Sequence, residues 1–402
     1  MNEHELRRYA RVILEVGVGL RAGQDLAINA QIEHAAFARV LCDEAYRAGA
    51  ELVDVWYWDP HTKLARLAHA PAASLPRTPE WLDARYRRLA ERSGALVNLA
   101  GDPEPDLLRD VDPARAGLDR MPALASRFEV QSRNEVQWCF AAVPTEGWAR
   151  QVLGRPDVEA LWRHLADVMR LRAADPVAAW WARMDELNAR CAALDEQSFD
   201  SLHYVGPGTD LRVGLPAGHR WGTAQLRARN GVRHVAALPT EEIFTTPDPR
   251  RTEGTVRASK PLALGGTLVE GLELRFEGGR IRGVDARRGA EVIRAQLDID
   301  EGAGRLGEVA LVDDTSPLQQ CGVLFYDTLL DESAASHLAW GGGIPDGHRD
   351  YDPARPETLT GLPINRSATH VDFMIGSPDL MVTGVRRDGS RRVILDGERW
   401  AV

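Results

Sequence analysis

The sequence predicts an α/β protein, with an N-terminal domain built on a parallel sheet and a C-terminal α+β domain that has a large antiparallel component. A chain of 402 residues is too long for one ordinary hydrophobic core, so two domains are expected. In the first half, short apolar runs alternate with amphipathic helical stretches, whereas in the second half glycine becomes more frequent and strand patterns dominate. A composition of 44% hydrophobic and 27% charged residues is typical of a folded globular protein.

Four apolar runs predict the strands of the N-terminal sheet, because apolar runs that alternate with amphipathic helices are typical of parallel sheets. The runs and the helical stretches that follow them are residues 25–31 and 34–47, 51–58 and 78–92, 95–99 and 114–133, and 138–143 and 157–169. A longer helical pattern at 177–193 contains no proline or glycine, and we place the domain boundary just after it. The two domains are therefore predicted to span residues 1–198 and 199–402.

The C-terminal half reads as strands interrupted by two helices. Residues 209–215 alternate polar and apolar side chains, which indicates a half-buried strand. Residues 268–284 read as two strands around Glu277-Gly278-Gly279, which is a hairpin signal. Helical patterns are expected at 290–297 and at 332–340. Together these patterns predict an α+β domain.

Charge and hydropathy exclude several classes of partner. The formal net charge of −10 argues against a nucleic acid held through its phosphates. No run of about 18 uncharged apolar residues is present, so no membrane span is expected. The N-terminal residues lack the features of a signal peptide, so a cytoplasmic protein is expected. The four cysteines are far apart in the sequence, which predicts neither a disulfide framework nor a thiolate zinc site.

Two acidic segments of the C-terminal half are candidates for catalytic chemistry. Glu241 and Glu242 lie side by side in PTEEIFTTP at 239–247, where the ordinary alternative is an exposed acidic turn. Glu308 lies inside the apolar strand pattern LGEVALV at 306–312. Because neighbouring strand residues point to opposite faces, Glu308 either meets solvent at a sheet edge or has a strong partner.

Two further segments add histidines. In LDESAASHL at 330–338, Glu332 and His337 are five residues apart, which is not the spacing of one helical face. The ordinary alternative is a capped helix, begun by Asp331 or Ser333, with an exposed histidine. In THVDFMIG at 369–376, a strand places His370 and Asp372 on the same face, either to bind a metal or simply to bond to each other.

Taken together, these segments predict a two-metal site. Four carboxylates would carry four negative charges, which two divalent cations would neutralise; they are Glu242, Glu308, Glu332 and Asp372. Mixed carboxylate and imidazole ligands suit zinc, cobalt or manganese, with magnesium as a further candidate. A carboxylate that bridges two metals about 3.5–4 Å apart is the usual arrangement for co-catalytic hydrolysis.

The same segments resemble the aminopeptidase T, aminopeptidase S and PepS family of bacterial metallopeptidases. The likeness runs over nearly the whole chain, in the order LPTEEIFTTPD, TVRASKPL, LGEVALV, LFYDTLLDESAASHLAWG and NRSATHVDFMIGS. The resemblance implies removal of N-terminal residues from peptides with a free N-terminus, and a homodimer. It implies as metal ligands Glu242, Glu308, Glu332, His337, His370 and Asp372. Glu242 is preferred to Glu241 because it directly precedes Ile243, and Glu308 is expected to bridge the metals at the activated water.

One position departs from the family pattern. The family usually has a tyrosine seven residues after the first histidine, proposed to stabilise the oxyanion, whereas this chain has Ile344. Loss of one oxyanion donor typically costs on the order of 10²–10³ in rate. Tyr351, His348 and Arg366 are therefore candidate substitutes.

Two other functions remain open at this point. Ring-cleaving dihydroxypyridine dioxygenases, which use one iron, resemble this family in the two histidines and Asp372, although Glu242 and Glu308 would be unnecessary there. A chain without the expected tyrosine could also retain its metals for structure and act as a binding protein or scaffold. Metal content separates the first alternative from hydrolysis, and an assay with aminoacyl p-nitroanilides tests the second.

Overall fold

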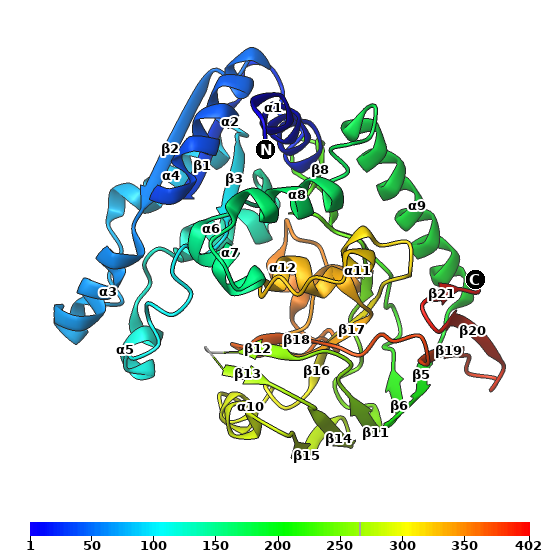
Figure 1. Ribbon diagram of the computed structural model, residues 1–402. Helices are drawn as coiled ribbons and strands as arrows, with labels where there is room; N and C mark the ends of the chain where they lie inside the picture. The colour runs from blue at the N-terminus through cyan, green and yellow to red at the C-terminus, as the bar shows by residue number, and fades with distance from the viewer. Residues whose placement is uncertain (265–266) are drawn as a thin grey trace. The chain divides into compact units, whose positions relative to one another are not determined.

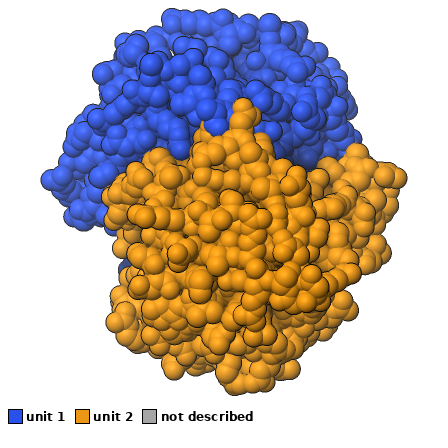
Figure 2. Space-filling model, turned by 90° about the vertical axis from the view of Figure 1, so that its right-hand side faces the viewer, with its two compact units in different colours: residues 1–182, 225–239 blue, residues 183–224, 240–402 orange. Residues whose placement is uncertain are grey.

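The computed structural model describes residues 1–264 and 267–402 (Figure 1). It contains two compact units, Met1–Ala182 with Gln225–Pro239 and Arg183–Ala224 with Thr240–Val402 (Figure 2). The second unit holds all of the predicted metal ligands. The division into separate domains at 1–198 and 199–402 stays a prediction.

The first unit is built on a parallel sheet, as predicted. Its five strands lie in the order β2-β1-β3-β4-β9, and each pairs in parallel with its neighbours. The strands are β1 (Asp25–Gln31), β2 (Leu52–Trp58), β3 (Ala95–Ala100), β4 (Gln137–Ala142) and β9 (Ala237–Leu238). The interior of β1 and all but the last residue of β3 are buried, which explains why these segments read as continuous apolar runs. The short β9 comes from much later in the sequence and was not predicted.

The predicted helices of this unit are present, with one correction. The predicted stretches correspond to α2 (Ala35–Arg47), α4 (Glu80–Glu91), α5 (Pro113–Leu118) with α6 (Ala125–Ser132), and α8 (Val158–Val168). The structure adds α1 (Glu3–Val12), α3 (Pro60–His69) and α7 (Glu146–Leu153). The helical stretch expected at 114–133 is two helices, α5 and α6. Pro122 lies between them, and proline lacks the backbone N–H that a continuous helix would need there.

An eight-stranded antiparallel sheet forms much of the second unit. Its strand order is β15-β14-β11-β6-β5-β19-β20-β21. The strands are β5 (Ser201–Gly206), β6 (Thr209–Gly214), β11 (Thr252–Arg257), β14 (Glu273–Glu277), β15 (Arg280–Asp285), β19 (Met381–Val385), β20 (Arg391–Asp396) and β21 (Arg399–Trp400). The predicted hairpin joins β14 to β15, and both Gly278 and Gly279 have the positive φ that its two-residue turn requires. The predicted helix α10 (Ala290–Leu297) is also present.

A smaller antiparallel sheet carries the predicted ligands. Its order is β10-β16-β17-β18, with β10 (Ile243–Thr245), β16 (Leu306–Leu311), β17 (His337–Gly341) and β18 (His370–Met374). The helix expected at 332–340 is wrong, because α12 (Thr328–Asp331) and a 3₁₀ turn (Glu332–Ala334) end before β17 begins. Every residue of β17 is buried between two paired strands, and a short buried apolar run cannot be told from a helix by its pattern.

The remaining elements complete the description. The long helix α9 (Pro176–Gln197) has its first residues in one unit and the rest in the other. Short pairs and helices are β7 (Gln225–Arg227), β8 (Arg233–Val235), β12 (Leu262–Leu264), β13 (Thr267–Val269) and α11 (Pro317–Cys321). Among the described residues, no helix combines the length and the apolar character needed to cross a membrane.

Buried His34 makes the stability of the first unit depend on pH. Its Nε2 lies 3.0 Å from the Gly101 carbonyl oxygen, and burial lowers its pKa from the ordinary value to about 4. Because the unfolded chain protonates this ring at about 6.5, unfolding should become easier as the pH falls from about 6.5 to 4. Urea midpoints across this range should drop for the wild type and drop less for His34→Gln. Parallel slopes for the two proteins would contradict the assignment.

Candidate metal centre

The register of the smaller sheet brings the predicted ligands to one face. Residues directly opposite each other in antiparallel strands share a face, and alternate residues along a strand do so as well. Ala339 lies opposite both Glu308 and Asp372. Ala339 is two residues after His337, and Asp372 is two residues after His370, so all four polar side chains point the same way.

The first acidic segment joins the same face from the other edge strand. Phe244 of β10 lies opposite Ala310, which is two residues after Glu308. Glu242 comes two residues before Phe244, so an extended backbone places its carboxylate toward the same side. This segment, the least specific of the four in sequence, therefore lies next to the others in space.

The opposite face of the sheet is apolar. Leu338 lies opposite Phe373, and the ring of Trp340 packs against that of Phe373 at 5.4 Å between centroids. These side chains and Val309 are fully buried. Such packing holds the strands rigidly, which keeps the carboxylates and imidazoles of the other face in place.

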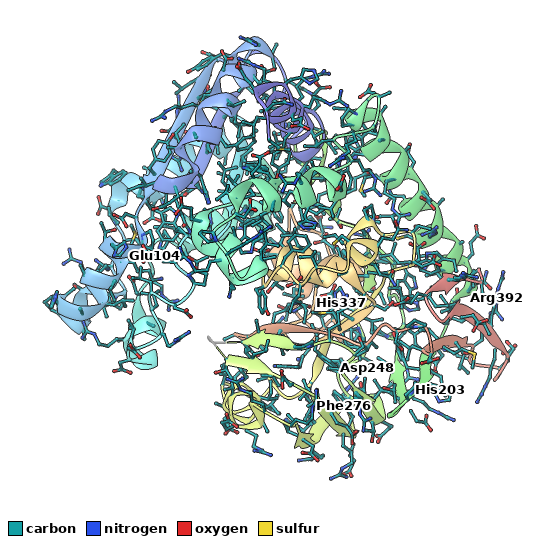
Figure 3. All side chains as sticks on the ribbon, viewed as in Figure 1. Glu104, His203, Asp248, Phe276, His337 and Arg392 are labelled. Atoms are coloured by element: carbon teal, nitrogen blue, oxygen red, sulfur yellow. The ribbon has the colours of Figure 1, made fainter. Side chains whose placement is uncertain are left out.

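Five of the six predicted residues form two overlapping groups. Ligand atoms of Glu242, Glu308 and His337 lie within 4.8 Å of one another, and so do those of Glu308, His370 and Asp372. Figure 3 labels His337, and the Nε2 atom of this residue is 3.5 Å from Glu242 Oε2. His370 Nε2 is 3.1 Å from Glu308 Oε2 and 3.2 Å from Asp372 Oδ1. Glu308 thus belongs to both groups.

Hydrogen bonds to the backbone orient both imidazole rings. His337 Nδ1 lies 3.2 Å from the Ala335 carbonyl oxygen, and His370 Nδ1 lies 2.7 Å from the Gly342 carbonyl oxygen. A carbonyl oxygen can only accept, so in each ring Nδ1 carries the hydrogen that it donates. Each ring therefore turns Nε2 toward the carboxylates, the atom through which a histidine held in this way binds a metal.

Burial and mutual repulsion dominate the electrostatics of the carboxylates. Burial, with the neighbouring charge of Glu308, raises the pKa of Glu242 to about 7. Burial and the charge of Glu242 also raise the pKa of Glu332 well above its usual range. Burial alone would lower the pKa of His370, but hydrogen bonds to Asp372 and Glu308 raise it to about 12. The site therefore has an excess of negative charge that calls for cations.

A buried carboxylate oxygen without a hydrogen-bond partner also supports a metal site. Glu242 Oε2 is buried and has no hydrogen-bond partner among the described residues, since the nearest donor, His337 Nε2, is 3.5 Å away. A buried carboxylate oxygen without a partner is costly, and a bound cation would satisfy this atom. Oxygen and nitrogen donors of this kind suit divalent zinc, cobalt or manganese.

Glu332 lies apart from the two groups. It begins the 3₁₀ turn after α12, and it lines a cavity together with Asp372. Its carboxylate interacts electrostatically with Glu242, Asp372 and Glu308. The predicted helix cap is wrong here, because the Asp331 carboxylate accepts hydrogen bonds from the amides of Phe325 and Asp327 instead.

The two neighbouring glutamates of the first segment have different surroundings. Glu241 is buried, and its Oε2 is 2.8 Å from Arg183 Nε. Arg183 also contacts Asp313 at 3.3 Å, so a buried charge network holds the backbone next to Glu242. This network could not be predicted from the sequence, because Arg183 lies on α9, far from both acids in the chain.

The three proposed substitutes for the missing tyrosine have other partners or lie elsewhere. His348 is buried, and its Nε2 is 2.9 Å from the Ala217 carbonyl oxygen. Arg366 donates to the Leu359 carbonyl oxygen at 3.1 Å. Neither these residues nor Tyr351 lines the cavity at Glu332, whereas Tyr326 does. Tyr326 was missed because no sequence signal connects it with the ligands.

This fold, with carboxylates and histidines gathered on one sheet face as candidate ligands, is that of a metalloenzyme. The chain belongs to the thermophilic metalloprotease (M29) family, which it matches over residues 2–400. The predicted resemblance is thereby confirmed, and the chain is an enzyme of a metallopeptidase family, a hydrolase acting on peptide bonds.

Curated relatives agree with this membership. Aminopeptidase T of Thermus thermophilus is 40% identical over 409 residues, covering 100% of this chain and 99% of the relative. Aminopeptidase 2 of Geobacillus stearothermophilus is 36% identical over 406 residues, covering 99% of this chain and 98% of the relative.

Solved structures agree with the fold. The wild-type AmpT structure from Thermus thermophilus matches with a TM-score of 0.89 at 38% identity, covering 100% of both chains. A 2,5-dihydroxypyridine dioxygenase from Pseudomonas putida matches with a TM-score of 0.57 at 12% identity, over 100% of this chain and 98% of that one. A likeness at this low identity shows the fold alone.

The position of Glu308 in both groups predicts its effect on metal binding. Glu308→Gln should lose at least one ion per chain after dialysis, because an amide is a weaker ligand than a carboxylate and cannot bridge equally well. Elemental analysis of the purified variant measures this loss. Glu241→Gln is the matched control. It should retain wild-type metal content but melt several degrees lower, because it weakens the buried pair with Arg183. Full metal content in Glu308→Gln would contradict the shared position.

Proposed function

We propose that the chain is an aminopeptidase that uses two divalent metal ions to remove the N-terminal residue of peptides. The main support is that two candidate ligand groups share Glu308, as a bridging carboxylate would require. Family membership and the names of the curated relatives support the exopeptidase activity. The proposed ligands are Glu242, Glu308, Glu332, His337, His370 and Asp372.

In this proposal each group holds one ion. Glu242 and His337 would complete one site, and His370 and Asp372 the other, with Glu308 between them. Glu332 would complete the set from the side of the cavity. Two divalent cations would balance the four carboxylates, whose burial and mutual repulsion raise the pKa of Glu242 and Glu332 in the metal-free site. Zinc, cobalt and manganese are the preferred ions, and magnesium is a further candidate.

The protein's own groups would orient the substrate. When bound, the ions supply Lewis acidity and a water of lowered pKa. The backbone hydrogen bonds at His337 and His370 fix both rings before substrate arrives. Carboxylate oxygens around the ions would accept hydrogen bonds from the α-amino group, in keeping with the proposed requirement for a free N-terminus. Glu308 lies at the shared position, where the attacking water is expected.

Tyr326 is our candidate for the hydroxyl donor that Ile344 cannot supply. It lines the same cavity as Glu332 and Asp372, and its φ of 55° is unusual for a residue other than glycine. The Asp331 carboxylate binds the amides on both sides of Tyr326, which stabilises this conformation. Strained residues of this kind often lie at active sites.

Removal of the Tyr326 hydroxyl should therefore slow catalysis. Tyr326→Phe should reduce kcat on the order of 10²–10³, with a smaller change in KM and with metal content unchanged. Tyr351→Phe should behave as the wild type and serves as the control. Equal kcat for Tyr326→Phe and the wild type would remove Tyr326 from the chemistry.

We also propose a homodimer in the cytoplasm. The dimer rests on the family resemblance alone. The location is supported by the four cysteines, which are all free in the structure, as is usual in a reducing compartment. Analytical ultracentrifugation tests the dimer.

The proposed activity is tested with leucine p-nitroanilide. Protein stripped with a chelator should be inactive, and cobalt, zinc or manganese should restore hydrolysis at two ions per chain. A single iron per chain would instead indicate a mononuclear site, such as a dioxygenase needs. Two ions without hydrolysis of any aminoacyl substrate would indicate a structural role for the metals.

A further inference from the structure

The cavity next to Glu332 and Asp372 has one apolar wall. Leu262, Ala263, Leu324 and Met374 line it together with Tyr326. These residues come from β12, from the segment before α12 and from β18, elements that Figure 1 shows together in the second unit. The cavity therefore adjoins the candidate metal centre.

The geometry of β18 connects this cavity to the metal centre. Met374 is two residues after Asp372, so both side chains lie on the sheet face that carries the ligands. Met374 is buried, with 5% of its surface exposed. A group that approaches Asp372 along this face next meets the side chain of Met374.

Three of the four acids that line the cavity are already engaged, in backbone hydrogen bonds or as proposed metal ligands. Both oxygens of Asp331 accept hydrogen bonds from backbone amides, at 2.8 Å from Phe325 N and 3.1 Å from Asp327 N. Glu332 and Asp372 are proposed metal ligands. Asp327, Thr328 and Tyr326 also line the cavity, and the rest of its wall is apolar, formed by Pro261, Leu262, Ala263, Leu324 and Met374. A side chain that enters would contact this apolar wall.

We propose that this cavity receives the side chain of the substrate's first residue, and that the preferred residues are aliphatic. The inference rests on the proposed aminopeptidase function and adds a substrate class to it. A peptide with its α-amino group at the acidic centre would direct its first side chain along the sheet face toward Met374.

The size of the cavity sets the upper limit of the preferred side chain. About 40 Å³ is open to the centre of a water molecule, which is space for about three waters. An aliphatic side chain of three or four carbons would fill this space by displacing the waters. An indole ring would not fit unless the walls moved. Leucine, valine and methionine should therefore be cleaved faster than tryptophan.

Two reciprocal variants test the proposal. Ala263→Phe adds bulk from an exposed position, so the variant should fold normally. It should lower kcat/KM for leucine p-nitroanilide at least tenfold relative to alanine p-nitroanilide, because pocket contacts discriminate by about tenfold or more per methylene. Leu324→Ala should enlarge the cavity and raise the ratio of kcat/KM for phenylalanine to that for leucine. Ala192→Phe, at an exposed position of α9, is the control and should leave both ratios unchanged.

Binding provides a readout that does not depend on turnover. Metal-loaded wild type should bind L-leucine more tightly than L-tryptophan by calorimetric titration, and Ala263→Phe should lose this difference at unchanged metal content. If the wild type cleaves aminoacyl substrates but Ala263→Phe keeps both the ratio and the leucine binding, the cavity is not the side-chain pocket and the aminopeptidase function stands. A preference for N-terminal arginine or lysine that Ala263→Phe leaves unchanged also overturns the proposal. Absence of any cleavage by the wild type counts against the proposed function itself.

Discussion

The excess of negative charge on one face of a buried sheet is the constraint on which the rest of the site depends. Glu308 and Asp372 are each less than a tenth exposed, and Glu242 is close to them. Buried carboxylates in one place repel one another and lose their hydration, so the protein must supply protons or cations. The excess of negative charge contributes to the raised pKa of both His370 and Glu242. Divalent ions remove it and at the same time create the chemistry of a hydrolase.

The surrounding structure stabilises this unfavourable arrangement in two ways. On the apolar face of the sheet, the tilted rings of Trp340 and Phe373 pack together and hold the strands in place. A buried ion pair between Arg183 and Glu241 holds the segment that delivers Glu242. The charge of Glu241 is thus used for structure and that of its neighbour for the site. Two adjacent and identical residue types can have opposite roles because an extended backbone points them in opposite directions.

Ile344 stands where the resemblance implies a tyrosine, so we propose that the hydroxyl donor comes from the other side of the centre. There, Asp331 holds the backbone around Tyr326, and the same loop forms the rim of a cavity with one apolar wall. A single buried carboxylate thereby positions a hydroxyl group and one wall of the proposed side-chain pocket. Chemistry and specificity would then share one element of structure.

Sequence by itself determined the features that depend on local periodicity. The parallel strands, the hairpin at Gly278 and the common face of His370 and Asp372 follow from patterns a few residues long. The sequence also determined the acidic character of the chain and, through its motifs, the family. It failed at 332–340, where strand pairing on both sides decides the structure, and between α5 and α6, where Pro122 interrupts the helical pattern.

Only the tertiary structure decided which residues meet. The register between β16, β17 and β18 places Glu308 opposite Ala339 and next to His370, although more than sixty residues separate the two ligands in the chain. It also decided that Glu241 faces Arg183 and that Tyr326 lines the cavity. These contacts result from pairing and packing of distant segments, whose free energy depends on the whole core. A local pattern contains no information about them.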